Sequence, residues 1–218
     1  MTYSICVRER TADGHRFGVA AAAHVPAVGS VCPHVSDRGA VAVAGTADAE
    51  VGARCLSALE DGRSVAAAVE ALADDGAAVD RHQIHGVGVA SAGTHTGGAC
   101  QSIAGHRAGN GYTVAGTSIA EESVLDALEQ AYLENERDAP LAYRLLTALA
   151  AGARAGGDGR DLPVGSAAVV VRTGRSEPLY HDLRVDASET PVVDLRETYR
   201  DAKRGYEAAL DHHQTENS

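Results

Sequence analysis

The order of the expected elements constrains the fold of this chain more than any single motif does. Short apolar runs over residues 3–8 and 17–23 predict a β-hairpin, because the residues between them have turn chemistry. The pattern then continues in groups: strands, two helices, strands, two helices, strands and a helix. Grouped elements are typical of two sheets packed face to face beneath outer helical layers, whereas a ferredoxin-like or doubly wound fold alternates strand and helix singly. We therefore expect an α+β fold, a four-layer αββα sandwich of two mainly antiparallel sheets.

The individual segments follow from hydrophobic periodicity. We expect one domain over residues 1–211 and a frayed tail over residues 212–218, where the periodicity ends. A polar glycine-rich bend is expected at residues 93–98, and a loop at residues 156–161. The expected helices span residues 48–59, 64–73, 118–135, 141–153 and 192–210, and the further strands span residues 29–33, 39–44, 83–90, 99–104, 112–116, 167–171 and 179–185.

Composition excludes several classes of function. The 30 acidic and 19 basic residues give a net charge of −11, so nucleic acid is a poor partner for this surface. With Lys203 as the only lysine, this balance fits either a salt-rich cytoplasm or a GC-rich genome. No apolar run approaches the roughly 20 residues of a membrane span and no signal peptide is visible, so we expect a cytoplasmic protein that does not enter a membrane. The four cysteines form no CxxC pair, which indicates small buried thiols.

The start of the chain carries the sharpest chemical hypothesis. If Met1 is removed, Thr2 presents a hydroxyl nucleophile and a free α-amine on one residue, the minimal apparatus of an N-terminal nucleophile hydrolase. An α-amine titrates near ~7.7–8.0, so it can accept the hydroxyl proton close to neutral pH. His24 ends the second strand of the expected hairpin, where it would return close to Thr2 as a base or cation. The alternatives are a Met-Thr start by chance and a polar residue that merely closes a strand.

A group of histidines and a cysteine leaves a metal-dependent enzyme as an alternative. His95, Cys100 and His106 lie on short connections, although their spacing lacks the two close ligand pairs of most zinc sites. Histidines that are hydrogen-bonded in a turn are commoner. His82 and His85 are three residues apart on an expected strand, so they point to opposite faces and are weak ligand candidates.

The loop at residues 156–161 suggests a different kind of site. Its glycines could bind an anion through backbone N–H groups, but it lacks the Lys-Ser/Thr of a phosphate-binding loop, which makes nucleotide binding improbable. Asp158 or Arg160 could instead reach the edge of the sheet and orient groups near Thr2. The alternative is a plain connection between a helix and a strand.

Motifs along nearly the whole chain resemble one family. This is the bacterial and archaeal family catalogued as domain of unknown function 1028, which is regarded as part of the N-terminal nucleophile hydrolase superfamily. The matching motifs are Met1-Thr2-Tyr3-Ser4-Ile5, Gly18-Val19-Ala20, Ala27-Val28-Gly29, Gly39-Ala40-Val41-Ala42, His95-Thr96-Gly97, Cys100, Ala104-Gly105-His106, Gly109 with Gly111-Tyr112, Gly156-Gly157-Asp158, Ser166-Ala167-Ala168 and Leu183-Arg184-Val185-Asp186.

The resemblance implies a function as well as a fold. It implies hydrolysis of an amide bond in a small molecule by Thr2, without a cofactor, in a homodimer or higher homo-oligomer. The chain departs from the family pattern at Val43-Ala44, where a Thr-Gln pair is usual, at Ala23, where a serine is usual, and in a longer loop before Ser166 that lacks a glutamine. A non-catalytic small-molecule binder on the same scaffold therefore stays open. The residues expected to contact the substrate are His95, Thr96, Thr117, which replaces a usual asparagine, and Asp158.

Overall fold

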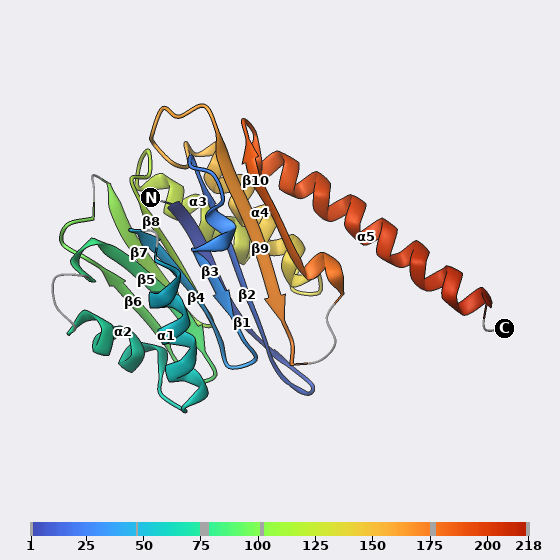
Figure 1. Ribbon diagram of the computed structural model, residues 1–218, viewed down its shortest axis with the longest axis horizontal. Helices are drawn as coiled ribbons and strands as arrows, with labels where there is room; N and C mark the ends of the chain where they lie inside the picture. The colour runs from blue at the N-terminus through green and yellow to red at the C-terminus, as the bar shows by residue number, and fades with distance from the viewer. Residues whose placement is uncertain (1, 47, 75–78, 101–102, 175–177, 217–218) are drawn as a thin grey trace.

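Two antiparallel β-sheets lie face to face in the computed structural model (Figure 1). One sheet has six strands in the order β10-β9-β2-β1-β8-β7, and the other has four in the order β3-β4-β5-β6. The structure describes residues 2–46, 48–74, 79–100, 103–174 and 178–216. Its strands are β1 (Thr2–Thr11), β2 (Gly14–Ala23), β3 (Pro33–Val35), β4 (Gly39–Gly45), β5 (His82–Gly88), β6 (Ala92–Thr96), β7 (Ala104–Gly109), β8 (Tyr112–Thr117), β9 (Gly165–Arg172) and β10 (Asp182–Ser188).

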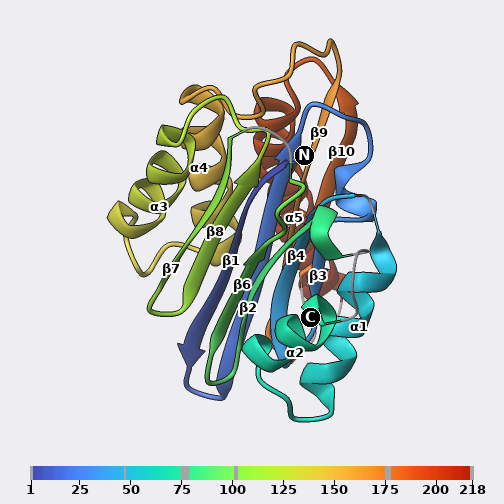
Figure 2. The same ribbon diagram turned by 90° about the vertical axis from the view of Figure 1, so that its left-hand side faces the viewer.

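Helices cover both outer faces, which confirms the expected four-layer sandwich. Helices α3, α4 and α5 contact the six-stranded sheet, and α1 and α2 contact the four-stranded sheet. Figure 2 shows α3 and α4 on one side of the two sheets and α1 and α2 on the other. No helix in the described part of the chain is long and apolar enough to cross a bilayer. The helices are α1 (Ala49–Glu60), α2 (Val65–Ala73), α3 (Ser123–Glu134), α4 (Leu141–Arg154) and α5 (Pro191–Glu216).

The hairpin of β1 and β2 forms the centre of the six-stranded sheet and confirms the first expectation. Side chains on β1 alternate between its two faces. Tyr3, Ile5 and Val7 belong to the apolar core beneath α3 and α4. Ser4 faces the other sheet, where it contacts His85 of β5. By the same alternation, Thr2 faces the space between the sheets.

The space between the sheets is apolar in one half and polar in the other. Phe17, Val19 and their neighbours fill the half around β2, β3 and β4. In the other half, the buried His85 ring lies 2.8 Å from Ser4 Oγ through Nε2 and 2.9 Å from Thr113 Oγ1 through Nδ1. Burial, and then the nearby His106, lower the pKa of His85 to about 3, so this ring is neutral at pH 7. It links β5 to β1 and β8 by hydrogen bonds.

Two segments differ from the sequence prediction: a turn replaces one expected strand, and a strand replaces most of one expected bend. Residues 29–33 are not a strand: a 3-10 turn occupies Val28–Ser30, started by Ala27 with φ 59°. Residues 93–98 are not simply a bend, because Ala92–Thr96 pairs with β5 as β6. A Cβ on Gly93 would lie 2.9 Å from the backbone nitrogen of Ala66, so this glycine allows α2 to approach the sheet.

Several boundaries also move. Helix α3 begins at Ser123 rather than at residue 118, because Ser118 has φ 54° and turns the chain after β8. Strand β7 begins at Ala104, so residues 99 and 100 are not a strand, and residues 101–102 lie outside the described residues. The chain forms a 3-10 turn over Leu179–His181 before β10.

Helix α5 extends beyond the sheets (Figure 1). It continues to Glu216, so the tail expected to fray from residue 212 is helical as far as this residue. Ion pairs between successive turns, such as Lys203 with Glu207 at 3.7 Å, favour this exposed helix.

Candidate functional site

Thr2 lies at the edge of a pocket between the two sheets. It is paired with Thr117 of β8, and its side chain is nearly buried. The pocket holds about 250 Å³, and most of its wall is apolar, with Val28 and Val43 among the lining residues. Arg160 is also among the residues that line this pocket. This arrangement places a hydroxyl-bearing residue, Thr2, and a basic residue, Arg160, around a cavity that fits a small, partly apolar molecule.

Asp158 holds Arg160 at this pocket. The buried carboxylate of Asp158 accepts a 2.8 Å hydrogen bond from Arg160 Nε and a second one from Arg160 Nη2, in a two-pronged ion pair. The backbone N–H of His24 donates to Asp158 Oδ2 at 2.8 Å. Burial alone would raise the pKa of Asp158, but the hydrogen bonds from Arg160 and His24 outweigh it and lower this pKa below its usual value. The carboxylate is therefore ionised, and the loop after α4 does reach the Thr2 pocket.

His24 contacts the same loop through its backbone N–H and through its ring Nδ1. Its Nδ1 lies 2.9 Å from the carbonyl oxygen of Arg160, and since a carbonyl only accepts, Nδ1 carries the proton. The hairpin does bring His24 to the end of β2 beside the start of β1, but His24 is not among the residues that line the pocket. The contacts assign it to positioning the Arg160 loop. Its role as a base toward Thr2 stays a prediction.

The contacts of Asp158 with Arg160 and His24, which we call the Asp158 clamp, make a testable contribution to stability. Replacing Asp158 by Asn should lower the free energy of unfolding at pH 7 by roughly 1.5–3 kcal/mol, because the hydrogen bonds to a charged group are lost. The lowered pKa means that the native contribution is complete above the unfolded carboxyl pKa, near 4, and fades as the pH falls through the folded value. Urea unfolding at pH 7 and pH 3, followed by circular dichroism, should show the difference between wild type and D158N shrinking in acid. The exposed Asp161 gives the control D161N, and equal effects of D158N and D161N would contradict the clamp.

A second cluster of polar groups surrounds Gln83 on β5. Gln83 Nε2 donates to the carbonyl oxygens of Gly116 and Gly105, at 2.9 and 3.0 Å, and to Thr96 Oγ1 at 3.1 Å. Thr96 Oγ1 is in turn 2.9 Å from His106 Nδ1. Burial, followed by the charges of nearby groups, lowers the pKa of His106. The structure thus brings Thr96 to the strand end that also carries Thr117.

The expected ligands of a metal do not converge. His95 is paired with Ile84 on the face toward the α1–α2 layer, and its Nε2 lies 3.4 Å from the carbonyl oxygen of Val79. Thr96, the next residue, faces the other sheet, so the two substrate-binding candidates lie on opposite faces of β6. Burial raises the pKa of the Cys100 thiol, which favours its protonated form. Among the residues that the structure describes, no group of three or more His, Cys, Asp or Glu side chains is arranged to hold a metal ion.

The other histidine pair behaves as the strand pattern predicts. His85 faces the space between the sheets, whereas His82 lies 3.9 Å from Asp48 at the start of α1. Sequence reasoning missed Gln83, although Gln83 and His85 share one face of a strand that is buried along its whole length. A polar residue at alternate positions of a buried strand was the signal that could have found it.

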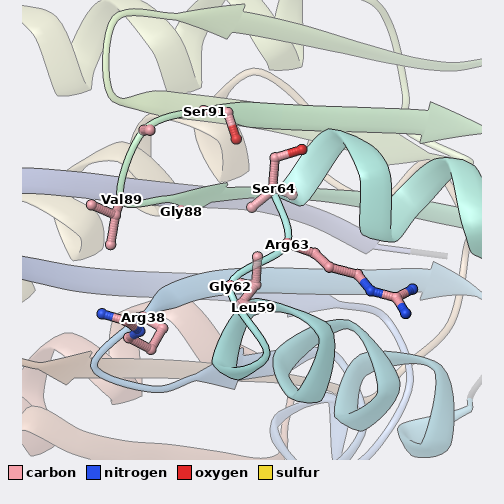
Figure 3. A pocket seen from close by; sticks show the side chains of 10 residues that line it. Arg38, Leu59, Gly62, Arg63, Ser64, Gly88, Val89 and Ser91 are labelled. Atoms are coloured by element: carbon pink, nitrogen blue, oxygen red, sulfur yellow. The ribbon is translucent and has the colours of Figure 1, made fainter.

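A different pocket lies at the opposite ends of the strands. It holds about 220 Å³ between the end of α1, the start of α2 and the turn after β5. Figure 3 shows the side chains of Arg38 and Arg63 extending in different directions there. Ser64 Oγ accepts the 3.0 Å hydrogen bond from the backbone nitrogen of Ala67 that caps α2. This second pocket has no residue that could combine a hydroxyl with a free α-amine, as Thr2 would without Met1, so the Thr2 pocket is the better candidate for an active site.

These features define a two-sheet α+β sandwich protein with a buried polar site at the strand ends. The chain belongs to a family described as a family of unknown function (DUF1028), whose family model matches residues 2–195. It is similar to the crystal structure of protein SPO2555 from Silicibacter pomeroyi, which matches the same family, with 25% sequence identity and a TM-score of 0.81. That alignment covers 92% of this chain and 88% of the other. No functionally curated protein is significantly similar to the chain.

Proposed function

We propose that the protein is an amidohydrolase in which Thr2 is the nucleophile and a small amide or peptide-like molecule is the substrate. The observation that carries the proposal is the place of Thr2, at the first position of a central strand, facing the gap between the sheets and sharing a pocket with Arg160. A four-layer arrangement with a hydroxyl at this position supports a relationship to the N-terminal nucleophile hydrolases. The homodimer and the cytoplasmic location stay predictions.

In the proposed reaction, the α-amine of Thr2 acts as the base in two successive steps. Thr2 Oγ1 attacks the substrate carbonyl carbon while the α-amine of Thr2 takes the hydroxyl proton. The resulting ammonium then protonates the leaving nitrogen as the C–N bond breaks, which leaves an ester on Thr2. Water hydrolyses this ester, with the α-amine again as the base, and releases the acid. The reaction requires removal of Met1, which lies outside the described residues, because an amide nitrogen on Thr2 could not accept the proton.

Arg160 supports the charge that develops in this reaction. Its ion pair with the buried Asp158 fixes the guanidinium in place before the substrate arrives. A donor that is held in position at a partly dry pocket stabilises an oxyanion without reorganising. Loss of one such donor slows turnover about 100- to 1000-fold in well-studied hydrolases.

Mass spectrometry tests the proposal directly. The intact mass of the purified chain should correspond to loss of Met1. Incubation with a simple β-lactone should add one acyl group, and peptide mapping should place it on Thr2, because the strained ester presents a carbonyl that a hydroxyl with an adjacent amine can open. The cysteines are the natural internal comparison, since burial raises the pKa of Cys32 and Cys100 and slows their thiolate chemistry. A retained Met1, or acylation confined to cysteine, would overturn the assignment.

A further inference from the structure

One exposed face of helix α5 carries like charges where attraction within the helix would be expected. Arg196 and Arg200 are four residues apart on this helix, and so are Glu207 and Asp211. All four residues are exposed, and the helical repeat of 3.6 residues places them on one stripe. Like charges four residues apart destabilise a helix. A partner with the opposite charge pattern would remove this repulsion.

The charges of this stripe have few partners on their own helix. Arg200 and Glu207 each lie near an exposed neighbour of opposite charge, at 3.5 and 3.7 Å, and such surface pairs stabilise little. Arg204, in the middle of the stripe, is bonded to a neighbouring carboxylate at 3.0 Å. Neither Arg196 nor Asp211 forms an ion pair within the described part of the chain. The outer charges of the stripe are therefore available to a second molecule.

A groove lies beside the basic end of the stripe, between α4 and α5. It holds about 180 Å³, and its lining includes Tyr143 and Leu146 of α4 and Val193 and Tyr199 of α5, together with the two arginines of the stripe. Tyr143 is 44% exposed and Val193 is 55% exposed. Covering two such side chains removes apolar surface from water, so the groove favours an apolar occupant.

The acidic end of the stripe carries an apolar side chain that suits this groove. Leu210 is 43% exposed, and the C-terminal half of α5 extends beyond the sheets (Figure 1). Leu210 and Tyr199 are eleven residues apart, close to three full turns, so both lie on the same side of α5. Because Tyr199 lines the groove, Leu210 of an antiparallel second helix would lie beside the same groove.

The stripe is complementary to itself. Its basic positions, 196 and 200, and its acidic positions, 211 and 207, lie at equal distances on either side of a point between residues 203 and 204. When two such helices run antiparallel about a two-fold axis at this point, 196 faces 211 of the other copy and 200 faces 207. An unrelated partner would need a matching stripe of its own, whereas a second copy already has one.

We propose that two copies of this chain form a dimer through antiparallel α5 helices in this register. Arg196 and Arg200 of each copy then pair with Asp211 and Glu207 of the other. Position 210 falls opposite position 197, inside the span of α5 that lines the groove, so Leu210 of each copy fills the groove of the other. The groove and the Thr2 pocket have no lining residue in common, so the interface does not depend on the chemistry of Thr2.

Charge reversal tests the register. Sedimentation velocity at about 10–100 µM protein, where dimers of moderate affinity are populated, should show wild type as a dimer. The variant Arg196→Glu with Arg200→Glu has an acidic stripe, and Glu207→Arg with Asp211→Arg has a basic one, so each alone should be monomeric because like charges face each other. An equal mixture of the two variants should form a heterodimer, which native mass spectrometry identifies by its mass, since opposite charges then face each other at every position.

The apolar contact is tested separately at Leu210. Leu210→Glu should raise the dissociation constant of the dimer about 100-fold or more, because the two-fold axis repeats the loss in both grooves. Leu133 of α3 is 57% exposed and does not line the groove, so Leu133→Glu is the matched control and should leave the dissociation constant unchanged. Sedimentation equilibrium measures the constants, and circular dichroism shows whether each variant is folded.

The outcomes decide the interface. A monomeric wild type would overturn it, and so would a dimer that persists in both charge variants and in Leu210→Glu. If the acidic and basic variants stay separate on mixing, the antiparallel register is wrong and the proposal falls. If Leu210→Glu fails to fold, Val193→Glu on the opposite side of the same contact decides, and an unchanged dissociation constant there would overturn the proposal.

Discussion

Replacing Thr2 by alanine is expected to abolish acylation of the chain while its fold stays intact. The substitution removes the attacking hydroxyl but keeps the α-amine, the strand and the pocket wall. Loss of the nucleophile should slow acylation by a β-lactone about 10³-fold or more, because no other group at this position can form the ester. The free energy of unfolding should change by about 1 kcal/mol, since a single neutral hydroxyl is removed. Intact-mass kinetics and urea unfolding measure the two effects.

Two further variants show whether the effect belongs to the hydroxyl. Thr2→Ser keeps an oxygen nucleophile and should be acylated, at a rate between those of wild type and Thr2→Ala. Thr11→Ala, at the other end of β1, makes the same chemical change away from the pocket and should leave acylation unchanged. Acylation of Thr2→Ala at the wild-type rate would contradict the assignment of Thr2 as the nucleophile.

The layers of the fold were predictable because they depend on local periodicity. Grouped runs with periods of two and 3.6 residues were enough to place helices outside two sheets. The errors lie where a local signal has a distant cause. Gly93 resembles a turn residue in the sequence, but the structure uses it for the close approach of α2 to β6. Such a contact between segments far apart in the chain cannot be seen in a window of ten residues.

The site was predictable only in part, for the same reason. Thr2 is recognisable from its own chemistry, and a hairpin of known register brings it near His24. The ion pair between Asp158 and Arg160 is local as well, so their chemistry was visible once the loop was noticed. Gln83 became a candidate only through atoms of β6, β7 and β8, since its Nε2 donates to the Thr96 hydroxyl of its own sheet and to two carbonyl oxygens of the opposite sheet. Predicting hydrogen bonds between the two sheets requires knowing the register of every strand involved.

A buried ion pair at the far end of β1 anchors α4 on the sheet. Glu9 Oε1 accepts from Arg144 Nη1, and the guanidinium of Arg144 lies 4.6 Å from the centre of the Tyr132 ring. Arg144 is only 5% exposed, and Arg16 approaches the same carboxylate at 3.8 Å. Removing the carboxylate would leave a buried positive charge without its counter-ion, which is far more costly than losing a surface pair.

Glu9→Ala is therefore expected to lower the free energy of unfolding by about 3 kcal/mol, at the lower end of the range for broken buried pairs because Glu9 is partly exposed. For a chain of this length, the melting temperature should fall by roughly 6–12 °C.

The exposed Glu197, 3.5 Å from Arg200, gives the control Glu197→Ala, which should lower the free energy of unfolding by about 1 kcal/mol or less. The double variant Glu9→Ala with Arg144→Met should recover much of the loss, since the orphaned charge is then gone. Equal melting temperatures for Glu9→Ala and Glu197→Ala would show that the pair contributes no more than a surface contact. Because Glu9 and Thr2 lie toward opposite ends of β1, acylation of Thr2 in the folded Glu9→Ala protein should proceed at the wild-type rate.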